Sequence, residues 1–554
     1  MKKSKIYAKN ISSLVKVFSN GNCFSPRECN YLTVLKGDSV SFQVVYYSET
    51  NTRAKIRCES KIEKITIRSI ENVYSNYPSK KEEIFEDGNY LRTNKGFYPD
   101  VLRELDGGEL NLKKKEFRTV RIDMEIPKDF VAGEYFVKVL LEVDGEIVCE
   151  TVQAIAVLNG QLNDAQLIHT EWIYLDCIAD YYKIKVFSKQ HWDYIEKFIK
   201  VAASRGINMI LTPLFTPPLD TYVGGDRTTV QLVDVYFDGQ NWSFGFDKFN
   251  KFIEIAKKCG IKYFEMSHLF SQWDIKYPPK IMAEINGKLE KVFGWHTPIS
   301  DGKYANFLRS FLPALIQRLE KLDIAQYTYF HVSDEPNVED DEKNYQRYCT
   351  ASQIVSPYIK EFRQIDAMSN VNFCKDGAVK TPVVSVRNIK KFLDNGITDL
   401  WAYYCFSPMK EYTNRFMAMT LARTRALGVQ LYKFKIKGFL HWGYNFYNTK
   451  LSRKKINPYK ITDAGKNYPS GDAFLVYPGK NGEPEESIRL MALYEAQRDL
   501  RALQTLEEKT SYEYVMSIVE KDIPQPIDFN NFPDSDYYYI HLRNTINKEI
   551  ERYS

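Results

Sequence analysis

The first 160 residues of the chain alternate apolar and polar side chains with a period of two. Runs of this kind occupy residues 40–46, 117–126 and 135–143, and an Asp-Gly turn signal at 144–145 follows the last of them. Short alternating runs without a helical stretch are typical of β-strands that bury one face. The pattern therefore predicts an antiparallel β-sandwich domain over residues 1–160.

After residue 160 the pattern changes to short apolar runs that alternate with amphipathic stretches of helical period. Strands are expected at residues 168–175, 208–214, 261–266, 400–405 and 438–442, with a further strand that begins at 327. Helices are expected at 188–206, 249–258, 307–319, 416–427 and 488–506. Ser188 is the expected N-cap of the first helix, and Gly206, Gly260 and Gly428 are the expected stops.

Alternating strands and helices over residues 161–510 predict a (β/α)8 TIM-like barrel, preceded by the sandwich. An open, doubly wound sheet is the alternative. The chain lacks the Gly-x-Gly-x-x-Gly and Gly-x-x-x-x-Gly-Lys motifs that would favour it for a nucleotide ligand. Residues 511–554 are a C-terminal extension whose structure the pattern does not predict.

Composition narrows the classes of partner. The 554 residues are 44% hydrophobic and 27% charged, and the net charge is only +5. The basic runs at 113–115 and 453–455 are short and isolated, so no nucleic-acid partner is expected. No apolar stretch has the length of a membrane span and no signal peptide is visible, so membrane insertion is not expected. The protein is predicted to be cytoplasmic, and a secreted form whose signal peptide has been removed is the alternative.

The nine cysteines are scattered, without a Cys-x-x-Cys pair. They predict reduced thiols rather than disulfides or a zinc site, and no metal or other cofactor is expected.

Two adjacent carboxylic acids, Asp334 and Glu335, stand where the strand that begins at Tyr327 should end, just before Pro336. In a (β/α)8 barrel the carboxyl ends of the strands carry the active site. We therefore predict that Asp334 and Glu335 are catalytic, although a solvated acidic loop is the alternative. His331, earlier on the same strand, is expected to support the pair through hydrogen bonds.

Aromatic and polar residues also follow the other expected strands, and flat rings stack well on sugars. The aromatic residues are therefore compatible with a glycan substrate, which is the hypothesis that we follow. The residues predicted to bind it are His268, Trp273, Trp295, Trp401, Tyr403, Trp442, Tyr444 and Asp472.

The adjacency of Asp334 and Glu335 limits the chemistry. Most glycosidases place two carboxylates on either side of the scissile bond, which neighbouring residues cannot easily do. The pair suits substrate assistance, in which a 2-acetamido oxygen of the sugar is the nucleophile. Glu335 would be the general acid and then the base, with a raised pKa, while an ionised Asp334 would orient the acetamido group. A tyrosine such as Tyr403 would donate to the acetamido oxygen.

Two alternatives stay open. A conventional pair could combine Glu335 with Glu265 or Asp220. A non-catalytic glycan-binding protein could keep the same barrel and aromatic residues.

Several long motifs resemble those of glycoside hydrolase family 123, the β-N-acetylgalactosaminidases, and of the related DUF4091 domain family. They are HVSDEP (331–336), LTPLFTPPLDT (211–221), HLFSQW (268–273), GFLHWGYNFY (438–447) and YPSGDAFLVYPG (468–479). The resemblance covers roughly residues 165–507 and implies a (β/α)8 catalytic domain with a retaining, acetamido-assisted mechanism without metal. It also implies a terminal β-linked N-acetylgalactosamine as substrate, as on glycosphingolipid-type glycans. One departure is Asp274, where the family pattern leads us to expect a glycine after Trp273.

Overall fold

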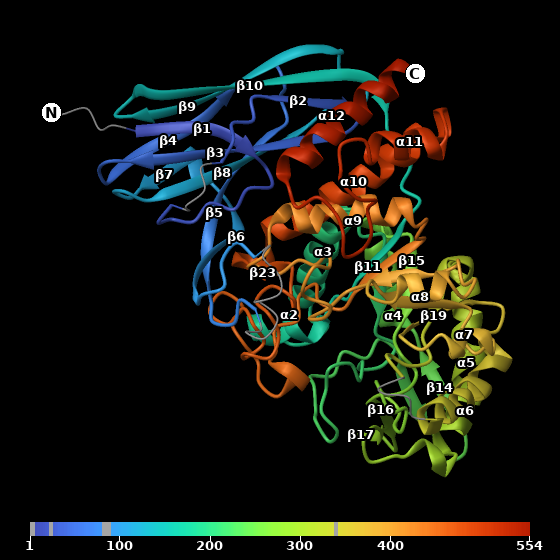
Figure 1. Cartoon of the computed structure of the whole chain (residues 1–554). Coiled ribbons are helices and arrows are strands. Elements are labelled where there is room, and N and C mark those ends of the chain that lie inside the picture. Colours follow the sequence, from blue (N-terminus) through green and yellow to red (C-terminus); the bar gives the residue numbers. More distant parts are fainter. Residues whose placement is uncertain (1–5, 22–25, 80–89, 337–341) are drawn as a thin grey trace.

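The structure is a computed structural model, and it describes residues 6–21, 26–79, 90–336 and 342–554. A β-sandwich lies at one end and a barrel surrounded by helices at the other (Figure 1).

The sandwich consists of two five-stranded sheets. The first has the order β1 (Ile6–Ser12), β3 (Ser39–Ser48), β8 (Phe117–Glu125), β5 (Ile65–Ser75) and β6 (Gly96–Glu104). The second has the order β2 (Tyr31–Lys36), β10 (Glu146–Gln161), β9 (Gly133–Val143), β4 (Thr52–Glu59) and β7 (Glu109–Leu112). The described pairs are antiparallel except β2 with β10. Alternate side chains such as Val120, Ile122 and Met124 fill the space between the sheets, so the predicted sandwich is confirmed.

Eight parallel strands close into a barrel in chain order, as the alternation predicted. They are β11 (Ile168–Glu171), β12 (Met209–Thr212), β15 (Tyr263–Met266), β18 (Thr328–Phe330), β19 (Arg363–Met368), β20 (Thr381–Ser385), β21 (Trp401–Tyr403) and β22 (Gly438–His441). The strands β19 and β20 were not expected individually. The first expected strand is shorter than predicted, because the chain leaves the barrel after Glu171 and starts a helix at Leu175.

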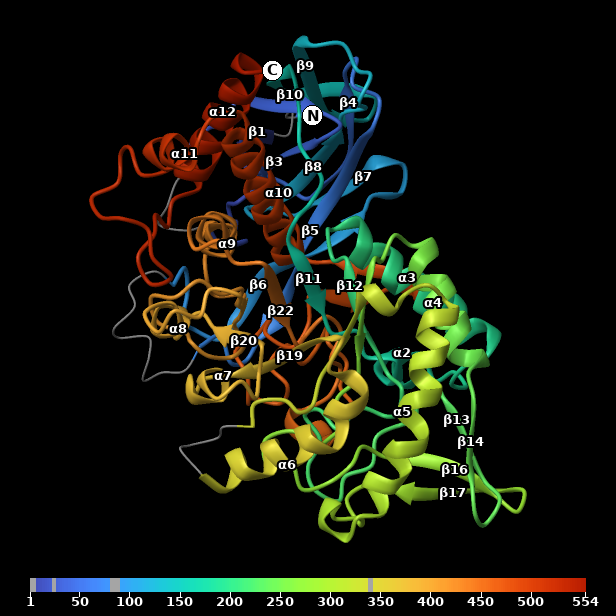
Figure 2. The ribbon, with the colours of Figure 1, turned by 90° about the vertical axis from the view of Figure 1, so that its right-hand side faces the viewer.

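Helices surround the barrel (Figure 2). They are α2 (Leu175–Tyr182), α3 (Lys189–Ser204), α4 (Asp247–Lys258), α5 (Lys303–Lys321), α6 (Glu342–Ile359), α7 (Asn372–Lys375), α8 (Ile389–Leu393), α9 (Leu421–Lys433) and α10 (Ile488–Lys509). Ser188 caps α3 as predicted, because its side chain accepts a hydrogen bond from the backbone N–H of His191.

The prediction that Gly428 ends a helix is wrong, since Gly428 lies inside α9. A Cβ at this position would lie only 2.0 Å from the backbone oxygen of Ala496 in α10. The glycine therefore allows the two helices to approach closely. The helix begins at Leu421 rather than Phe416, where Thr420 supplies the N-cap.

Two small sheets extend the barrel loops. The first has the order β14 (Trp242–Gly245), β13 (Asp234–Phe237), β16 (Ile281–Ile285) and β17 (Lys288–Phe293), and lies at the end of the molecule remote from the sandwich (Figure 2). The second pairs β23 (Val476–Pro478) with β24 (Pro484–Glu486).

The C-terminal extension contains the helices α11 (Tyr512–Val519) and α12 (Asp536–Arg552). α12 packs on the sandwich, where Asn544 Oδ1 accepts a hydrogen bond from the backbone N–H of Thr33 at 2.8 Å. Its Arg543 forms ion pairs with Asp38 of the sandwich and Asp499 of α10. The extension therefore joins the sandwich to the barrel.

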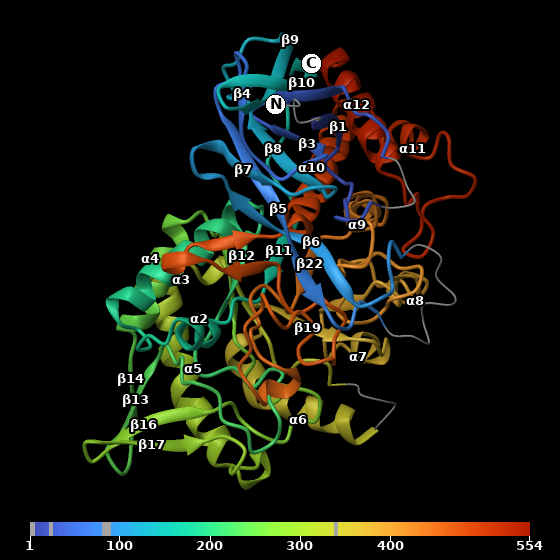
Figure 3. The same ribbon diagram turned by 90° about the vertical axis from the view of Figure 1, so that its left-hand side faces the viewer.

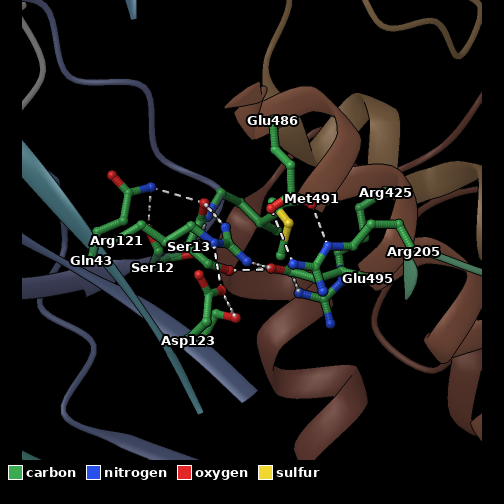
Figure 4. A network of polar contacts seen from close by, with 12 residues as sticks. Ser12, Ser13, Gln43, Arg121, Asp123, Arg205, Arg425, Glu486, Met491 and Glu495 are labelled. Carbon is green, nitrogen blue, oxygen red and sulfur yellow. Dashed lines mark hydrogen bonds and ion pairs between the residues drawn. The ribbon is translucent and has the colours of Figure 1, made fainter. Parts of the chain in front are cut away.

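A buried ionic network forms a second connection between the sandwich and the barrel (Figure 4). Glu495 of α10 accepts hydrogen bonds from Arg121 of β8 at 2.7 Å and from Arg425 of α9 at 2.8 Å. Near it, Glu486 pairs with Arg68 of β5 and with Arg205. β5 and β6 also reach from the sandwich towards the late loops of the barrel (Figure 3), where Asp100 pairs with Arg489 at 2.8 Å.

Among the described residues, no helix is long and apolar enough to cross a membrane. The eight described cysteines are free, and Cys23 lies outside the described residues.

Candidate active site

A pocket with about 580 Å³ of empty space opens where the loops that follow the barrel strands converge. Among the described residues, the carboxylic acids that line it are Asp220, Asp334 and Glu335. The aromatic residues that line it are Trp172, Tyr174, Trp273, Tyr403, Phe406, Trp442 and Tyr468. Its mixture of aromatic walls with a few polar groups suits a small, polar ligand with apolar faces.

Glu335 is held at both carboxylate oxygens. The Tyr403 hydroxyl donates to Oε1 at 2.8 Å, and the Trp273 indole N–H donates to Oε2 at 3.3 Å. The backbone of Glu335 is left-handed, with φ of 46°, and that of Trp273 is also left-handed, with φ of 65°. A left-handed backbone is strained in residues other than glycine, and such strain is concentrated at functional sites, where surrounding contacts hold it in place.

Asp334 is almost fully buried beside Glu335. The amide of Gln272 donates to Asp334 Oδ2 at 2.7 Å, and the backbone N–H of Trp273 donates to the Asp334 carbonyl at 2.9 Å. Burial, followed by the charge of Glu335, raises the pKa of Asp334 well above its ordinary range. His331 and the Gln272 hydrogen bond act in the opposite direction and lower the pKa of Asp334.

His331, three residues before Asp334, lies between two buried carboxylates. Its Nε2 is 2.6 Å from Glu265 and its Nδ1 is 3.2 Å from Asp366. Although burial opposes a charge, these two partners raise the pKa of His331 to about 10. The resulting imidazolium favours an ionised Asp334, so the expected supporting role of His331 is also electrostatic.

Glu265, one of the two carboxylates beside His331, does not line the pocket. Its carboxylate is fully buried and accepts hydrogen bonds from Thr170, from the Trp172 indole and from His331. The alternative that pairs Glu335 with Glu265 is therefore wrong, because a substrate cannot reach this carboxylate.

Asp220 does line the pocket. Its Oδ1 accepts hydrogen bonds from the backbone N–H of Leu451 at 3.1 Å and from the Tyr468 hydroxyl at 3.0 Å. Burial raises the pKa of Asp220.

The predicted substrate-binding residues separate into two groups. Trp273, Tyr403 and Trp442 line the pocket with the two acids. His268, Tyr444 and Asp472 are buried behind it. The His268 ring stacks on His331 at 4.1 Å, and Tyr444 donates to the Phe198 carbonyl in α3.

Trp295 and Trp401 lie elsewhere. Trp295 donates to the carbonyl of Gly225 at 2.9 Å and steadies that loop. Trp401 packs on Tyr329 in a cavity at the opposite end of the barrel, so the prediction that it contacts the substrate is wrong. Trp401 starts β21 and Tyr403 ends it, and only the residue at the carboxyl end reaches the pocket.

Sequence reasoning did not select Trp172, Tyr174, Phe406 and Tyr468 as site residues. Trp172 directly follows the first barrel strand, so its position offered a signal. Tyr468 lies in one of the quoted motifs, but nothing local to it shows that it meets Asp220.

A closed (β/α)8 barrel with an acidic, aromatic pocket at the carboxyl ends of its strands is typical of glycosidases that are built on a barrel. Residues 172–506 match the model of the glycoside hydrolase 123 catalytic domain. The chain therefore belongs to glycoside hydrolase family 123, and it is a glycosidase.

The chain is similar over nearly its whole length to a solved family 123 glycoside hydrolase from Clostridium perfringens, studied for the hydrolysis of glycolipid glycans. The two share 16% identity with a TM-score of 0.72, over 99% of this chain and 97% of that one. At this identity the likeness shows the fold.

A Bacteroides ovatus GH5 xyloglucanase matches with 11% identity and a TM-score of 0.30, over 85% of this chain and 98% of that one. A putative β-galactosidase from Bacteroides fragilis matches with 10% identity and a TM-score of 0.30, over 89% of this chain and 60% of that one. A comparison with curated proteins gives no match.

Proposed function

We propose that the protein removes a terminal β-linked N-acetylgalactosamine from glycans of the glycolipid type, by a retaining mechanism in which the sugar's own acetamido group is the nucleophile. The observation that carries this proposal is the adjacency of Asp334 and Glu335 on one wall of the pocket. Two consecutive residues suit one proton-transfer group and one orienting group better than two groups on opposite faces of a bond.

In the first step, the acetamido carbonyl oxygen attacks C1 and the bond from C1 to the leaving oxygen breaks. Glu335 gives its proton to that oxygen, and a cyclic oxazolinium forms. In the second step, Glu335 takes a proton from water, the water oxygen attacks C1, and the ring opens with the original configuration restored. Asp334 accepts the acetamido N–H throughout and balances the positive charge of the oxazolinium.

The substrate itself would set the protonation of the pair. The raised pKa of Asp334 favours a proton on this carboxyl before the substrate binds. An acetamido N–H forms a stronger hydrogen bond with an ionised Asp334 than with a protonated one, so substrate binding favours transfer of the proton to Glu335. The Gln272 amide supports the same change, because its donated hydrogen bond stabilises the ionised form.

Tyr403 lies next to the proposed acid, since its hydroxyl donates to Glu335 Oε1 at 2.8 Å. Rotation of this hydroxyl when Glu335 becomes protonated would make it available to the acetamido oxygen.

The test compares two aryl glycosides that differ only at C2. We expect hydrolysis of an aryl β-N-acetylgalactosaminide and at most trace hydrolysis of the aryl β-galactoside, and NMR of the first product should show retention. Equal rates on both sugars would refute acetamido assistance and would favour the conventional alternative, in which Asp220 acts as the nucleophile beside Glu335.

The non-catalytic alternative makes a separate prediction. A purely glycan-binding protein would be indifferent to Glu335→Gln, whereas we expect this variant to lose turnover and keep substrate affinity. Family membership supports catalysis over this alternative.

A further inference from the structure

Asp220 has a carboxylate oxygen that the protein leaves unused. Its Oδ1 is occupied by Leu451 and Tyr468, whereas its buried Oδ2 has no hydrogen-bond partner among the described residues. The side chain is only 6% exposed and lines the pocket. A buried carboxylate oxygen without a donor costs free energy, so a donor is expected from whatever fills the pocket.

One glutamine fixes the position of Asp220 relative to Asp334. The backbone N–H of Asp220 donates to Gln272 Oε1 at 2.8 Å, and Gln272 Nε2 donates to Asp334 Oδ2 at 2.7 Å. Because a backbone N–H can only donate, the orientation of the amide is settled. The Gln272 amide thus connects the backbone of Asp220 to the carboxylate of Asp334, and both side chains line the same pocket.

We propose that Asp220 Oδ2 binds the C3 or C4 hydroxyl of the sugar in the pocket and restricts the enzyme to terminal residues. This rests on the proposed function, in which the acetamido group at C2 lies at Asp334. A hydroxyl both donates and accepts, so it pairs with the carboxyl whether that group is ionised or protonated. A sugar that carries a further residue on this oxygen lacks the hydroxyl proton that Asp220 Oδ2 would accept.

The surroundings of Asp220 suit a sugar ring. The Tyr468 ring lies 5.3 Å from Phe406 and 5.3 Å from Trp442, and all three line the pocket. Aromatic faces pack against the C–H groups of a pyranose while the carboxylate binds its hydroxyl. Because Tyr468 and Leu451 occupy Oδ1 of Asp220, Oδ2 is the carboxylate oxygen that still lacks a donor among the described residues.

The test measures binding, which does not require turnover. N-acetylgalactosamine and its 3-deoxy, 4-deoxy and 6-deoxy analogues are titrated by calorimetry into the wild-type protein and into Asp220→Asn. We expect the wild type to bind either the 3-deoxy or the 4-deoxy analogue about tenfold to a hundredfold more weakly than the parent sugar. In Asp220→Asn the parent sugar should weaken by a similar factor, and that one analogue should weaken no further.

Asp226→Asn is the matched control, because it makes the same substitution on the same loop at an exposed carboxylate outside the pocket lining. It should bind all four sugars as the wild type does. If Asp220→Asn fails to fold, the titrations of the wild type with the deoxy analogues still test the proposal.

The proposal is overturned if the wild type binds no sugar, binds all three analogues as tightly as the parent, or discriminates only at C6. It is also overturned if Asp220→Asn weakens all four sugars equally, which indicates a structural role for the loop. A protein that shows the expected binding pattern without hydrolysing the acetamido glycoside would refute only the proposed function. Hydrolysis without the binding pattern would refute only the role of Asp220.

Discussion

The indole nitrogen of Trp273 lies 3.3 Å from Oε2 of Glu335, and both residues have a left-handed backbone. The backbone N–H of Trp273 also donates to the carbonyl of Asp334, so the two strained loops hold each other. Because the two loops fix this geometry jointly, the Glu335 carboxylate is already oriented. It therefore loses less conformational entropy when a substrate binds than a free side chain would.

The Tyr403 hydroxyl completes the support of Glu335, and its removal should impair catalysis more than binding. We expect Tyr403→Phe to lower kcat by about tenfold to a hundredfold on an aryl β-N-acetylgalactosaminide with little change in KM, because one donor that orients the carboxylate is lost. Steady-state kinetics measures both constants. Tyr404→Phe is the control, since the neighbouring Tyr404 hydroxyl has no hydrogen-bond partner among the described residues. An equal loss in both variants would contradict the role of Tyr403.

Asp334 should destabilise the protein at neutral pH. Its pKa is raised on folding, so the native state holds a proton that the unfolded state releases as pH rises above about 3.8. Stability is therefore lost as pH rises from that value through the raised pKa. We expect Asp334→Asn to raise the free energy of unfolding by about 1–2 kcal/mol at pH 7 while abolishing most activity.

Urea unfolding at pH 4 and pH 7 checks this expectation, since the advantage of Asp334→Asn should shrink towards pH 4. Asp129→Asn, at an exposed position, should change stability little at either pH. A variant that is less stable than the wild type at pH 7 would contradict the raised pKa of Asp334.

Much of this site could be predicted from local sequence. The apolar run before Asp334 and Glu335 marks a strand, and the change to acidic residues and proline marks its carboxyl end. Trp401 and Tyr403 show the limit of such reasoning, because alternation places both on one face of β21 but does not tell which end of a three-residue strand meets the pocket.

Contacts between distant segments could not be predicted from the sequence. Gly428 has the sequence signature of a helix stop, yet its role depends on the backbone of Ala496 in another helix. The meeting of Asp220 with Tyr468 joins residues 248 positions apart, and no local pattern encodes it. The helix α12 was missed for the same reason, because the sandwich surface that it covers stands near the other end of the chain.

The buried imidazolium of His331 predicts a loss of stability at alkaline pH. Its pKa rises from the ordinary 6.5 to about 10 on folding. The stabilisation that the charged imidazolium provides is complete below pH 6.5 and disappears as pH rises through 10. Over that window we expect the free energy of unfolding of the wild type to fall by roughly 2–4 kcal/mol more than that of His331→Gln. Urea unfolding at pH 6, 8 and 10 measures the difference, and the exposed His296→Gln should follow the wild type at each pH. Parallel curves for wild type and His331→Gln would contradict a charged His331.

The network around Glu495 should contribute strongly to the attachment of the sandwich. Its carboxylate serves Arg121 of the sandwich and Arg425 of α9, and all three side chains are buried (Figure 4). Glu495→Gln leaves two buried guanidinium groups with less compensating charge, and we expect it to lower the free energy of unfolding by about 3–5 kcal/mol. Glu150→Gln is the control, because its pair with Lys138 spans 4.0 Å on the exposed face of the sandwich and should matter by less than about 1 kcal/mol. Urea unfolding of both variants decides the matter. A similar, small effect in both would mean that hydrophobic contacts and α12 hold the two parts together without the network.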